Sequence, residues 1–357
     1  MTQSTLHRTF TSDNIAGASP EVIAAIGRCN TGPALPYGND PLTRAVEQKF
    51  AEIFEREVDV FLVSTGSAAN ALALAAVTPP WGSILSHADA HINRDECGAP
   101  EFYTAGAKLV QLPGDAGKIS PATLAMHAGR MVGDVHSVQP SCVSITQATE
   151  VGTLYSCYEI AAIADICRNA GLPLHMDGAR FANALSSLGC SPAELTWKAG
   201  VDLVSFGATK NGTMGVDAVL SFRKDIASAL AFRRKRAGQL SSKMRFMAAQ
   251  MDAYLNDDLW LRNADHANKM ARGLASGLAQ IPAVEIQQSP QENILFCRMP
   301  MQYITGLLDR GFNFYHDRWE PGIVRFVTSF TTTPDDIEDL IEQTRLLAGA
   351  TPEESLK

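Results

Sequence analysis

Hydrophobic positions recur with two different periods along the first 250 residues. Within the segment 41–55, Leu42, Val46, Phe50 and Ile53 fall on one helical face, because side chains three or four positions apart lie on the same side of a helix. Apolar runs of strand length follow, and we expect strands over residues 58–65, 141–148, 172–177, 201–208 and 218–222. Apolar strands that alternate with helices predict an α/β fold, with a mostly parallel sheet covered on both faces.

Two of the expected helices have clear local signals. The alanine-rich segment GSAANALALAAV follows the first strand directly. The segment CYEIAAIADICRNAG ends in Gly171, the residue type that most often closes a helix at its C-terminus. These segments place helices between the strands of the predicted sheet.

The pattern changes after about residue 250. A long helix, expected over residues 257–280, precedes the strand-like segments NILFCRM, FNFYHD and IVRFVTSF, and a last helix begins near TPDDIEDLIEQ. This pattern predicts a smaller α+β domain. We therefore expect an N-terminal segment and a large domain in residues 1–250, and a small C-terminal domain in residues 251–357.

Composition narrows the functional class. Apolar residues make up 46% of the 357 residues, enough for a sizeable core, and the formal charge of −8 argues against nucleic acid as a partner. The basic cluster RRKR at 233–236 is typical of a solvated helix face. Seven cysteines without a CxxC pair favour a reduced, cytoplasmic protein. No apolar leader and no 18-residue apolar run are present, so we expect neither secretion nor a membrane partner.

Several common motifs are absent or incomplete. No GxGxxG and no GxSxG occurs, and GDAGKIS around Lys118 lacks the spacing of a phosphate-binding loop. In HADAH, His87 and His91 have a spacing that could share a metal ion, but the internal glutamate and a nearby third ligand are missing. We therefore expect no metal site.

Lys210, in SFGATKNG, closes an apolar strand-like run. A lysine in such a place needs either a partner or a chemical task, although a surface lysine with an exposed ammonium is the simpler alternative. Asp177, in HMDGARFANA, also lies at the end of a predicted buried strand, where open α/β sheets bind their ligands. Alternatively, Asp177 has only a structural role and forms an ion pair with Arg180.

The segment TGSAAN opens a helix directly after a strand. Its free backbone N–H groups and the Ser67 hydroxyl could bind phosphate, or the serine could simply cap a tight turn. A phosphate site, a strand-end carboxylate and a strand-end lysine together suit pyridoxal phosphate. Lys210 would bind its aldehyde, Asp177 would keep its pyridine nitrogen protonated, and Gly212 would let the backbone turn beside it.

The ordered motifs SDNIAG, YGND, GSAAN, DECGAPEF, HMDGARFANA and FGATKNG resemble the threonine aldolase family of fold-type-I pyridoxal-phosphate enzymes over residues 10–345. The chain is most similar to the bacterial low-specificity aldolases and to phenylserine aldolase. The resemblance implies an aminotransferase-like fold. It also implies retro-aldol cleavage of β-hydroxy-α-amino acids, such as L-phenylserine, L-threonine or allo-threonine, to glycine and benzaldehyde or acetaldehyde.

The resemblance also assigns roles to residues around the cofactor. It places His91 over the pyridine ring, Gly66 and Ser67 at the phosphate, and Arg180 beside the cofactor on the substrate side. Asp177 and Lys210 keep the roles given above.

Four further residues match the family's substrate and subunit contacts. Ser12 and Arg325 would bind the substrate α-carboxylate, for which the arginine fork is well shaped. Tyr37 and Arg245 would reach the active site of a neighbouring subunit, so the resemblance implies a homotetramer, a dimer of dimers with shared active sites.

The sequence departs from the family pattern at two places. Thr149 and Glu150 lie where many members have a histidine that contacts the substrate hydroxyl, and Asp95 replaces an aromatic residue. His91 is our first candidate for the general base, and a water held by Glu150 is the second. Two other functions stay open: a β-eliminating lyase that yields a keto acid and ammonia, and a cofactor-binding or scaffold protein without turnover.

Overall fold

The structure, a computed structural model, describes residues 8–349. By packing, this part of the chain divides into two compact units, one of residues 18–260 and one that joins residues 8–17 to residues 261–349. The domain boundary expected after residue 250 stays a prediction. No helix within the described range is long and apolar enough to cross a membrane.

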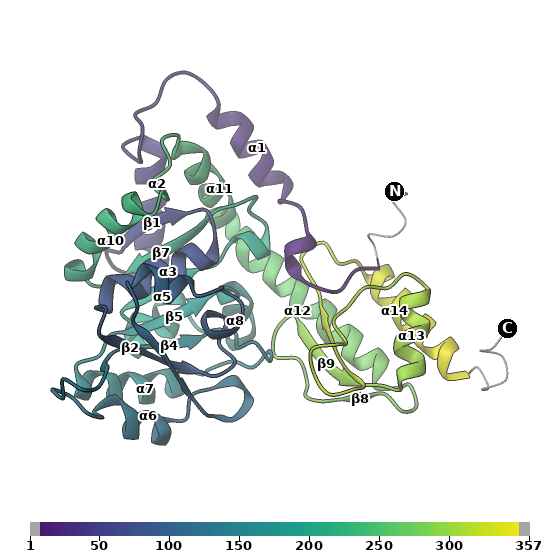
Figure 1. Cartoon of the computed structure of the whole chain (residues 1–357). Helices are drawn as coiled ribbons and strands as arrows, with labels where there is room; N and C mark the ends of the chain where they lie inside the picture. The colour runs from purple at the N-terminus through teal and green to yellow at the C-terminus, as the bar shows by residue number, and fades with distance from the viewer. Residues whose placement is uncertain (1–7, 350–357) are drawn as a thin grey trace. The chain divides into compact units, whose positions relative to one another are not determined.

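The larger unit is built on a seven-stranded sheet with the strand order β1-β7-β6-β5-β4-β2-β3 (Figure 1). Strands β2 to β6 pair in parallel, and β7 runs antiparallel to both of its neighbours. The mostly parallel α/β sheet predicted from the sequence is therefore confirmed. The strands are β1 (Asp59–Val63), β2 (Gly82–His87), β3 (Lys108–Leu112), β4 (Gln139–Thr146), β5 (Leu174–Gly178), β6 (Leu203–Phe206) and β7 (Asp217–Ser221).

The helices of the larger unit connect these strands and pack against the sheet and one another. They are α1 (Pro20–Cys29), α2 (Pro41–Ile53), α3 (Gly66–Val77), α4 (His91–Arg94), α5 (Ala99–Tyr103), α6 (Pro121–Ala128), α7 (Cys157–Ala170), α8 (Phe181–Leu188), α9 (Pro192–Leu195), α10 (Lys224–Arg236) and α11 (Arg245–Leu255). As expected, α7 ends at Gly171, which has a φ of 69°.

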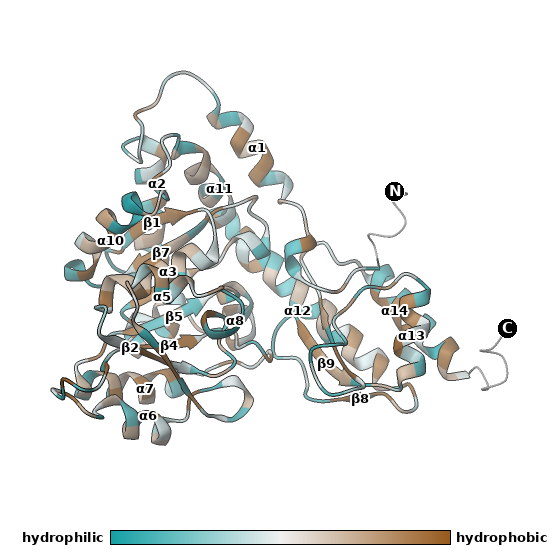
Figure 2. Ribbon diagram, in the orientation of Figure 1, coloured by the Kyte–Doolittle hydropathy of each residue, from teal (hydrophilic) through white to brown (hydrophobic). Residues whose placement is uncertain are grey.

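Helix α3 packs against the central strands, and its residues 69–75 are all buried. A helix that is apolar on all sides can only be stable inside a core. Figure 2 shows a similar contrast within the unit, with strand β1 largely hydrophobic and helix α10 largely hydrophilic. The deepest helix of the larger unit is therefore the one that begins directly after β1.

The smaller unit has an antiparallel sheet of order β10-β9-β8, with β8 (Glu285–Ile286), β9 (Ile294–Arg298) and β10 (Ile323–Val327). Its helices are α12 (Leu259–Leu278), which starts at the end of the larger unit, α13 (Met301–Asp309) and α14 (Pro334–Gly349). This is the expected α+β arrangement. The strand expected for FNFYHD is wrong, because this segment makes only isolated bridges, Asn313 with Thr9 and Tyr315 with Arg325.

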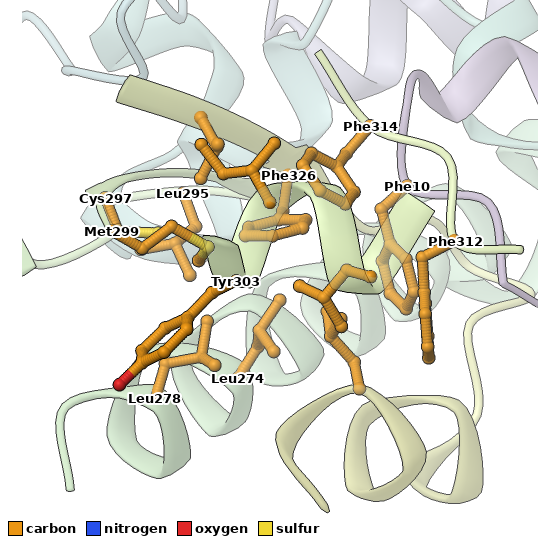
Figure 3. Packing of buried hydrophobic residues seen from close by; sticks show 14 of the residues in the cluster. Phe10, Leu274, Leu278, Leu295, Cys297, Met299, Tyr303, Phe312, Phe314 and Phe326 are labelled. Carbon is orange, nitrogen blue, oxygen red and sulfur yellow. The ribbon is translucent and has the colours of Figure 1, made fainter. Parts of the chain in front are cut away.

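The segment before α1 is part of the smaller unit's core. The Phe10 N–H donates to the Asn313 carbonyl at 2.7 Å, and the Val327 N–H donates to the Phe10 carbonyl at 2.9 Å. The Phe10 ring packs against Phe326 with ring centroids 6.1 Å apart and lies close to Phe312 (Figure 3). The start of the described chain therefore completes a core whose other members come from beyond residue 260.

Candidate active site

Asp177 lies at the carboxyl end of β5 and is 3% exposed. Its Oδ2 accepts a hydrogen bond from Asn70 Nδ2 at 2.8 Å, and its Oδ1 accepts one from the Ala179 N–H at 3.1 Å. A buried carboxylate is stable only with such donors or a cation. The structure therefore holds an acceptor oxygen at the edge of the sheet where α/β proteins bind ligands.

Asn70 is a residue of this site that the sequence reasoning missed. It lies in the second turn of α3, is 2% exposed, and donates from Nδ2 both to Asp177 and to Glu96 Oε1, the second bond also being 2.8 Å long. A signal for it exists in the sequence. Asn70 is the one polar residue in the run 68–77 of an otherwise apolar helix, and a buried polar side chain requires partners.

Glu96, also missed, joins Asn70 to His91. The His91 Nδ1 is 2.8 Å from Glu96 Oε1, and the Glu96 side chain is fully buried whereas that of His91 is 31% exposed. Burial raises the pKa of the Glu96 carboxyl. The hydrogen bond to Glu96, followed by the charges of Asp177 and Glu150, raises the pKa of His91 against the opposing effect of burial. The segment 95–98 has no regular structure, so spacing could not have paired these residues.

The start of α3 offers backbone donors. Thr65 Oγ1 caps the helix by accepting a hydrogen bond from the Ala68 N–H at 3.1 Å, so the alternative in which a serine caps this turn is wrong. The N–H groups of Gly66 and Ser67 have no hydrogen-bond partner among the described residues. A Cβ added to Gly66 would meet nothing nearer than Asp217 Oδ2, 4.0 Å away. These two N–H groups are suited to an anionic ligand such as phosphate.

Lys210 lies in a short 3₁₀ turn that is anchored on both sides. Before it, the buried Asp217 carboxylate accepts hydrogen bonds from the N–H groups of Ala208 at 2.7 Å and Thr209 at 3.0 Å. After it, Asn211 Nδ2 donates to the Tyr254 hydroxyl at 2.7 Å. The half-buried lysine is thus fixed at its backbone, and its loop follows β6.

The strand ends that carry Asp177 and Lys210 lie next to each other. Asp177 pairs with Ser205 in the parallel ladder of β5 and β6, and the Gly207 N–H donates to the Gly178 carbonyl at 3.0 Å. A Cβ on Gly207 would lie only 2.6 Å from the Ala179 carbonyl oxygen, so this close approach requires glycine. The small residues around the two motifs therefore bring both chemical groups to one edge of the sheet.

Tyr37 and Arg245, two further predicted site residues of the larger unit, have no hydrogen bond to this cluster within residues 8–349. Arg180 precedes α8 and is 6% exposed, whereas Tyr37 is 45% exposed. Arg245 begins α11 and donates from Nη1 to the Gly32 carbonyl at 2.8 Å. Within residues 8–349, no hydrogen bond connects Tyr37 or Arg245 to Asp177, and their predicted roles stay predictions.

Ser12 and Arg325 both lie in the smaller unit, where Arg325 contacts the residue that precedes Ser12. Arg325, on β10, donates from Nη2 to the Thr11 carbonyl at 3.5 Å, directly beside Ser12. The Arg325 guanidinium also lies 4.8 Å from the centre of the Tyr315 ring. Ser12 Oγ accepts a hydrogen bond from the Asn14 N–H at 3.1 Å. Their predicted role as ligands of a carboxylate stays a prediction.

Both ring nitrogens of His87 form hydrogen bonds with the backbone. Its Nε2 is 3.0 Å from the Gly114 carbonyl oxygen, to which it donates, because its Nδ1 accepts from the Asp89 N–H at 3.1 Å. In the described part of the chain, no group of three or more His, Cys, Asp or Glu side chains could hold a metal ion.

These residues fit pyridoxal 5'-phosphate. The Asp177 oxygens can accept from a protonated ring nitrogen, the N–H groups of Gly66 and Ser67 can donate to a phosphate, and Lys210 supplies an amine beside them. The fold and these groups together define the class of protein: it is a fold-type-I enzyme that uses pyridoxal 5'-phosphate.

Comparisons with known proteins identify the family. Residues 9–300 match the family described as beta-eliminating lyase. The chain is 45% identical over 341 residues to the low specificity L-threonine aldolase of Pseudomonas aeruginosa, with 96% of this chain and 98% of the relative covered. The chain therefore belongs to the beta-eliminating lyase family and, within it, to the threonine aldolases. It is a pyridoxal-phosphate-dependent aldehyde lyase.

Solved structures agree with this assignment. The threonine aldolase of Leishmania major superposes with a TM-score of 0.89 at 29% identity, covering 96% of this chain and 99% of the other. The serine palmitoyltransferase of Sphingomonas wittichii, with a TM-score of 0.73 at 17% identity over 96% and 88% of the two chains, shares the fold alone. The aminotransferase-like fold expected from the sequence is confirmed.

Proposed function

We propose that the protein cleaves β-hydroxy-α-amino acids to glycine and an aldehyde. L-Threonine, L-allo-threonine and L-phenylserine are the proposed substrates, the first two giving acetaldehyde and the third benzaldehyde. The observation that carries the proposal is His91, a histidine held 2.8 Å from a buried carboxylate in the same cluster as Asp177. Cleavage requires a base for the β-hydroxyl proton, and a partly exposed imidazole suits that task near neutral pH.

The chain's own groups divide the remaining work. When bound, pyridoxal phosphate supplies an electron sink for the pair released from the Cα–Cβ bond. Asp177 holds the proton on the ring nitrogen, the N–H groups of Gly66 and Ser67 hold the phosphate, and Lys210 holds the aldehyde carbon.

The substrate carboxylate is the second fixed point of the proposed reaction. Arg325 and Ser12 would bind it, and Arg180 would contact the substrate beside the cofactor. Binding the carboxylate orients the bond to be broken, which is the contribution that positioning makes to catalysis. Support comes from the hydrogen bond of Arg325 to the carbonyl of Thr11, the residue that precedes Ser12 in the chain.

His91 takes the β-hydroxyl proton in this proposal. Its Nδ1 is committed to Glu96, so Nε2 is the nitrogen available for substrate. A water held by Glu150 is the alternative base, and the charge of Glu150 does act on His91. If His91 is the base, a substitution of His91 removes activity. If the water is the base, a substitution of Glu150 does.

A second candidate is elimination of a β-substituent to give a keto acid and ammonia. The family description, beta-eliminating lyase, favours it, and the same cofactor site would serve. Only the products separate the two reactions.

The test follows products after L-threonine or L-phenylserine is added separately to the protein loaded with cofactor. Glycine with acetaldehyde or benzaldehyde, in equal amounts, is the expected result, and the two rates rank the substrates. A keto acid with ammonia, without glycine, would replace the aldolase proposal by the elimination. No product from either substrate would contradict both proposed reactions on these substrates.

The Lys210→Ala variant tests the covalent anchor. We expect loss of the absorbance of lysine-bound cofactor and of nearly all turnover. Lys118→Ala is the matched control, since this lysine is ion-paired to Glu159 at 2.8 Å and should not affect either measurement. Substantial turnover without Lys210 would contradict the assignment.

We also propose a cytoplasmic homotetramer, a dimer of dimers in which Tyr37 and Arg245 complete the site of a neighbouring subunit. The exposed apolar side chains of Tyr37 (45%) and Leu35 (65%) support burial of this segment by another copy. Sedimentation gives the mass of the assembly. Mixing Lys210→Ala with Arg245→Ala subunits should restore activity, because a hybrid dimer contains one site with both residues intact.

A further inference from the structure

We propose that Glu96 is a positioning residue which, together with Asn70, fixes the orientation and the tautomer of His91 so that Nε2 is its basic nitrogen. The inference rests on the proposed function of His91 as the base. Its geometric ground is a chain of three hydrogen bonds, each 2.8 Å long, that runs from Asp177 through Asn70 and Glu96 to His91.

The donors and acceptors of this chain fix its direction. An amide nitrogen carries two hydrogens, and both hydrogens of Asn70 Nδ2 are used, one on Asp177 Oδ2 and one on Glu96 Oε1. The reversed amide would put its oxygen against two carboxylate oxygens, which is repulsive. Glu96 Oε1 is therefore an acceptor.

The same oxygen is 2.8 Å from His91 Nδ1, so this nitrogen must carry the hydrogen. The conclusion holds in both charge states of Glu96, because a proton on the carboxyl would occupy Oε2, which has no hydrogen-bond partner among the described residues. In neutral His91 the lone pair then lies on Nε2. A free imidazole has no such constraint.

Because Glu96 and Asn70 are buried, they can hold His91 in one tautomer. Glu96 is fully buried at its side chain and Asn70 is 2% exposed, so neither can exchange its partner for water. The charged groups that act on His91 are Glu96, Asp177 and Glu150. Of these three, only Glu96 touches the ring, so it alone can select a tautomer.

Two substitutions at position 96 separate charge from geometry. In Glu96→Gln, the amide oxygen can replace Oε1 and keep the bonds from Asn70 and His91, while the amide nitrogen takes the place of Oε2. The negative charge is then lost and the orientation is kept. Glu96→Ala removes both. Asp95→Asn is the control, because it removes an exposed carboxylate from the neighbouring position.

The first readout is made without cofactor or substrate. The chain has 8 histidines, so labelling with ¹⁵N-histidine and comparison with His91→Phe assigns the His91 ring signals. The original protein, Asp95→Asn and Glu96→Gln should all show neutral His91 with hydrogen on Nδ1. Glu96→Ala should show hydrogen on Nε2 or a mixture. An unchanged tautomer in Glu96→Ala would overturn the proposal.

The same spectra give the His91 titration. Loss of the Glu96 charge in Glu96→Gln should lower the His91 pKa, whereas Asp95→Asn should leave it unchanged. If Glu96→Ala does not fold, Asn70→Ala is the second variant. It removes one donor to Glu96 and frees the carboxylate to rotate, so a wild-type tautomer distribution in a folded Asn70→Ala protein would count against the role given to Asn70.

Turnover is the second readout. Glu96→Ala should lose about 10²-fold or more in kcat with a much smaller change in KM, the size of a lost general base. Glu96→Gln should keep most of kcat at high pH, with the acidic limb of the pH profile moved to lower pH. An equal loss in both variants would mean that charge, not orientation, is the contribution of Glu96. If His91→Phe is fully active, the proposed base fails while the tautomer result stands by itself.

Discussion

The charge of Asp177 acts on two histidines of the larger unit, and the pKa values of these histidines shift in opposite directions. The pKa of His91, at the start of α4, is raised, chiefly by its hydrogen bond to Glu96. The pKa of His175, the second residue of β5, is lowered from 6.5 to about 4, because burial outweighs the charge of Asp177. The surroundings of His91 thus favour its protonated form, whereas those of His175 favour its neutral form.

The partners explain the difference. His175 is fully buried between two hydroxyl groups, with Nδ1 2.9 Å from Ser144 Oγ and Nε2 2.9 Å from Ser205 Oγ. Hydroxyl groups can donate or accept, so they suit a neutral ring and do not compensate a positive charge. His91 instead faces the Glu96 Oε1 acceptor and is partly open to solvent. Burial and the type of partner decide the pKa shift of each histidine, even though the charge of Asp177 acts on both.

The largest expected effect is on turnover in His91→Phe. The phenyl ring can still cover the cofactor but cannot take a proton, so kcat should fall by about 10²–10⁴-fold. Steady-state cleavage of L-threonine measures this loss, and the absorbance of bound cofactor is the control for an intact site. Unchanged turnover would show that His91 is not the base, and the two histidines would then differ in pKa but not in catalytic role.

The next effect is on stability in His175→Leu. Both serine hydroxyls would lose their partner inside the sheet, which should lower the free energy of unfolding by about 3–4 kcal/mol. Urea unfolding of the cofactor-free protein measures it, and kcat of the folded protein should change far less than in His91→Phe. The triple variant Ser144→Ala/His175→Leu/Ser205→Ala should recover part of the loss. A stable His175→Leu protein with no activity would reverse the roles of the two histidines.

The lowered pKa of His175 also predicts acid sensitivity. Between pH 6.5 and about 4 the unfolded chain binds a proton at this histidine and the folded chain does not, so stability falls as the pH falls. The loss over this interval should reach roughly 3 kcal/mol. Urea unfolding at constant protein concentration from pH 7 to 4.5 measures it. The triple variant should show a flatter profile, and an equally steep profile there would assign the loss to other groups.

The smallest effect is expected for Glu150→Gln. Glu150 acts on His91 only through its charge, so the acidic limb of the pH profile should move slightly to lower pH while kcat stays within about threefold. The pH dependence of kcat measures both. A loss as large as in His91→Phe would make a water held by Glu150 the base.

Much of the fold could be predicted because its signals are local. The alternation of strands and helices, the glycine that ends α7 and the strand-end positions of Asp177 and Lys210 all follow from periodicity over a few residues. Strands β2 and β3 were not expected, and FNFYHD was expected as a strand although it pairs only at single residues. A hydrophobic pattern shows that residues are buried, but not that they pair in a sheet. In FNFYHD, Phe312 and Phe314 are buried in a core, and the segment does not form a strand.

The sequence by itself determined the α/β architecture and the family motifs, since each depends on residues close together in the chain. Only the tertiary structure decided which polar groups meet. Asn70 and Asp177 are 107 positions apart, Phe10 packs with residues beyond position 300, and His175 owes its neutrality to hydroxyls from two other strands. The strength of a hydrogen bond and the pKa of a group depend on distance and burial in space, and a linear sequence records neither.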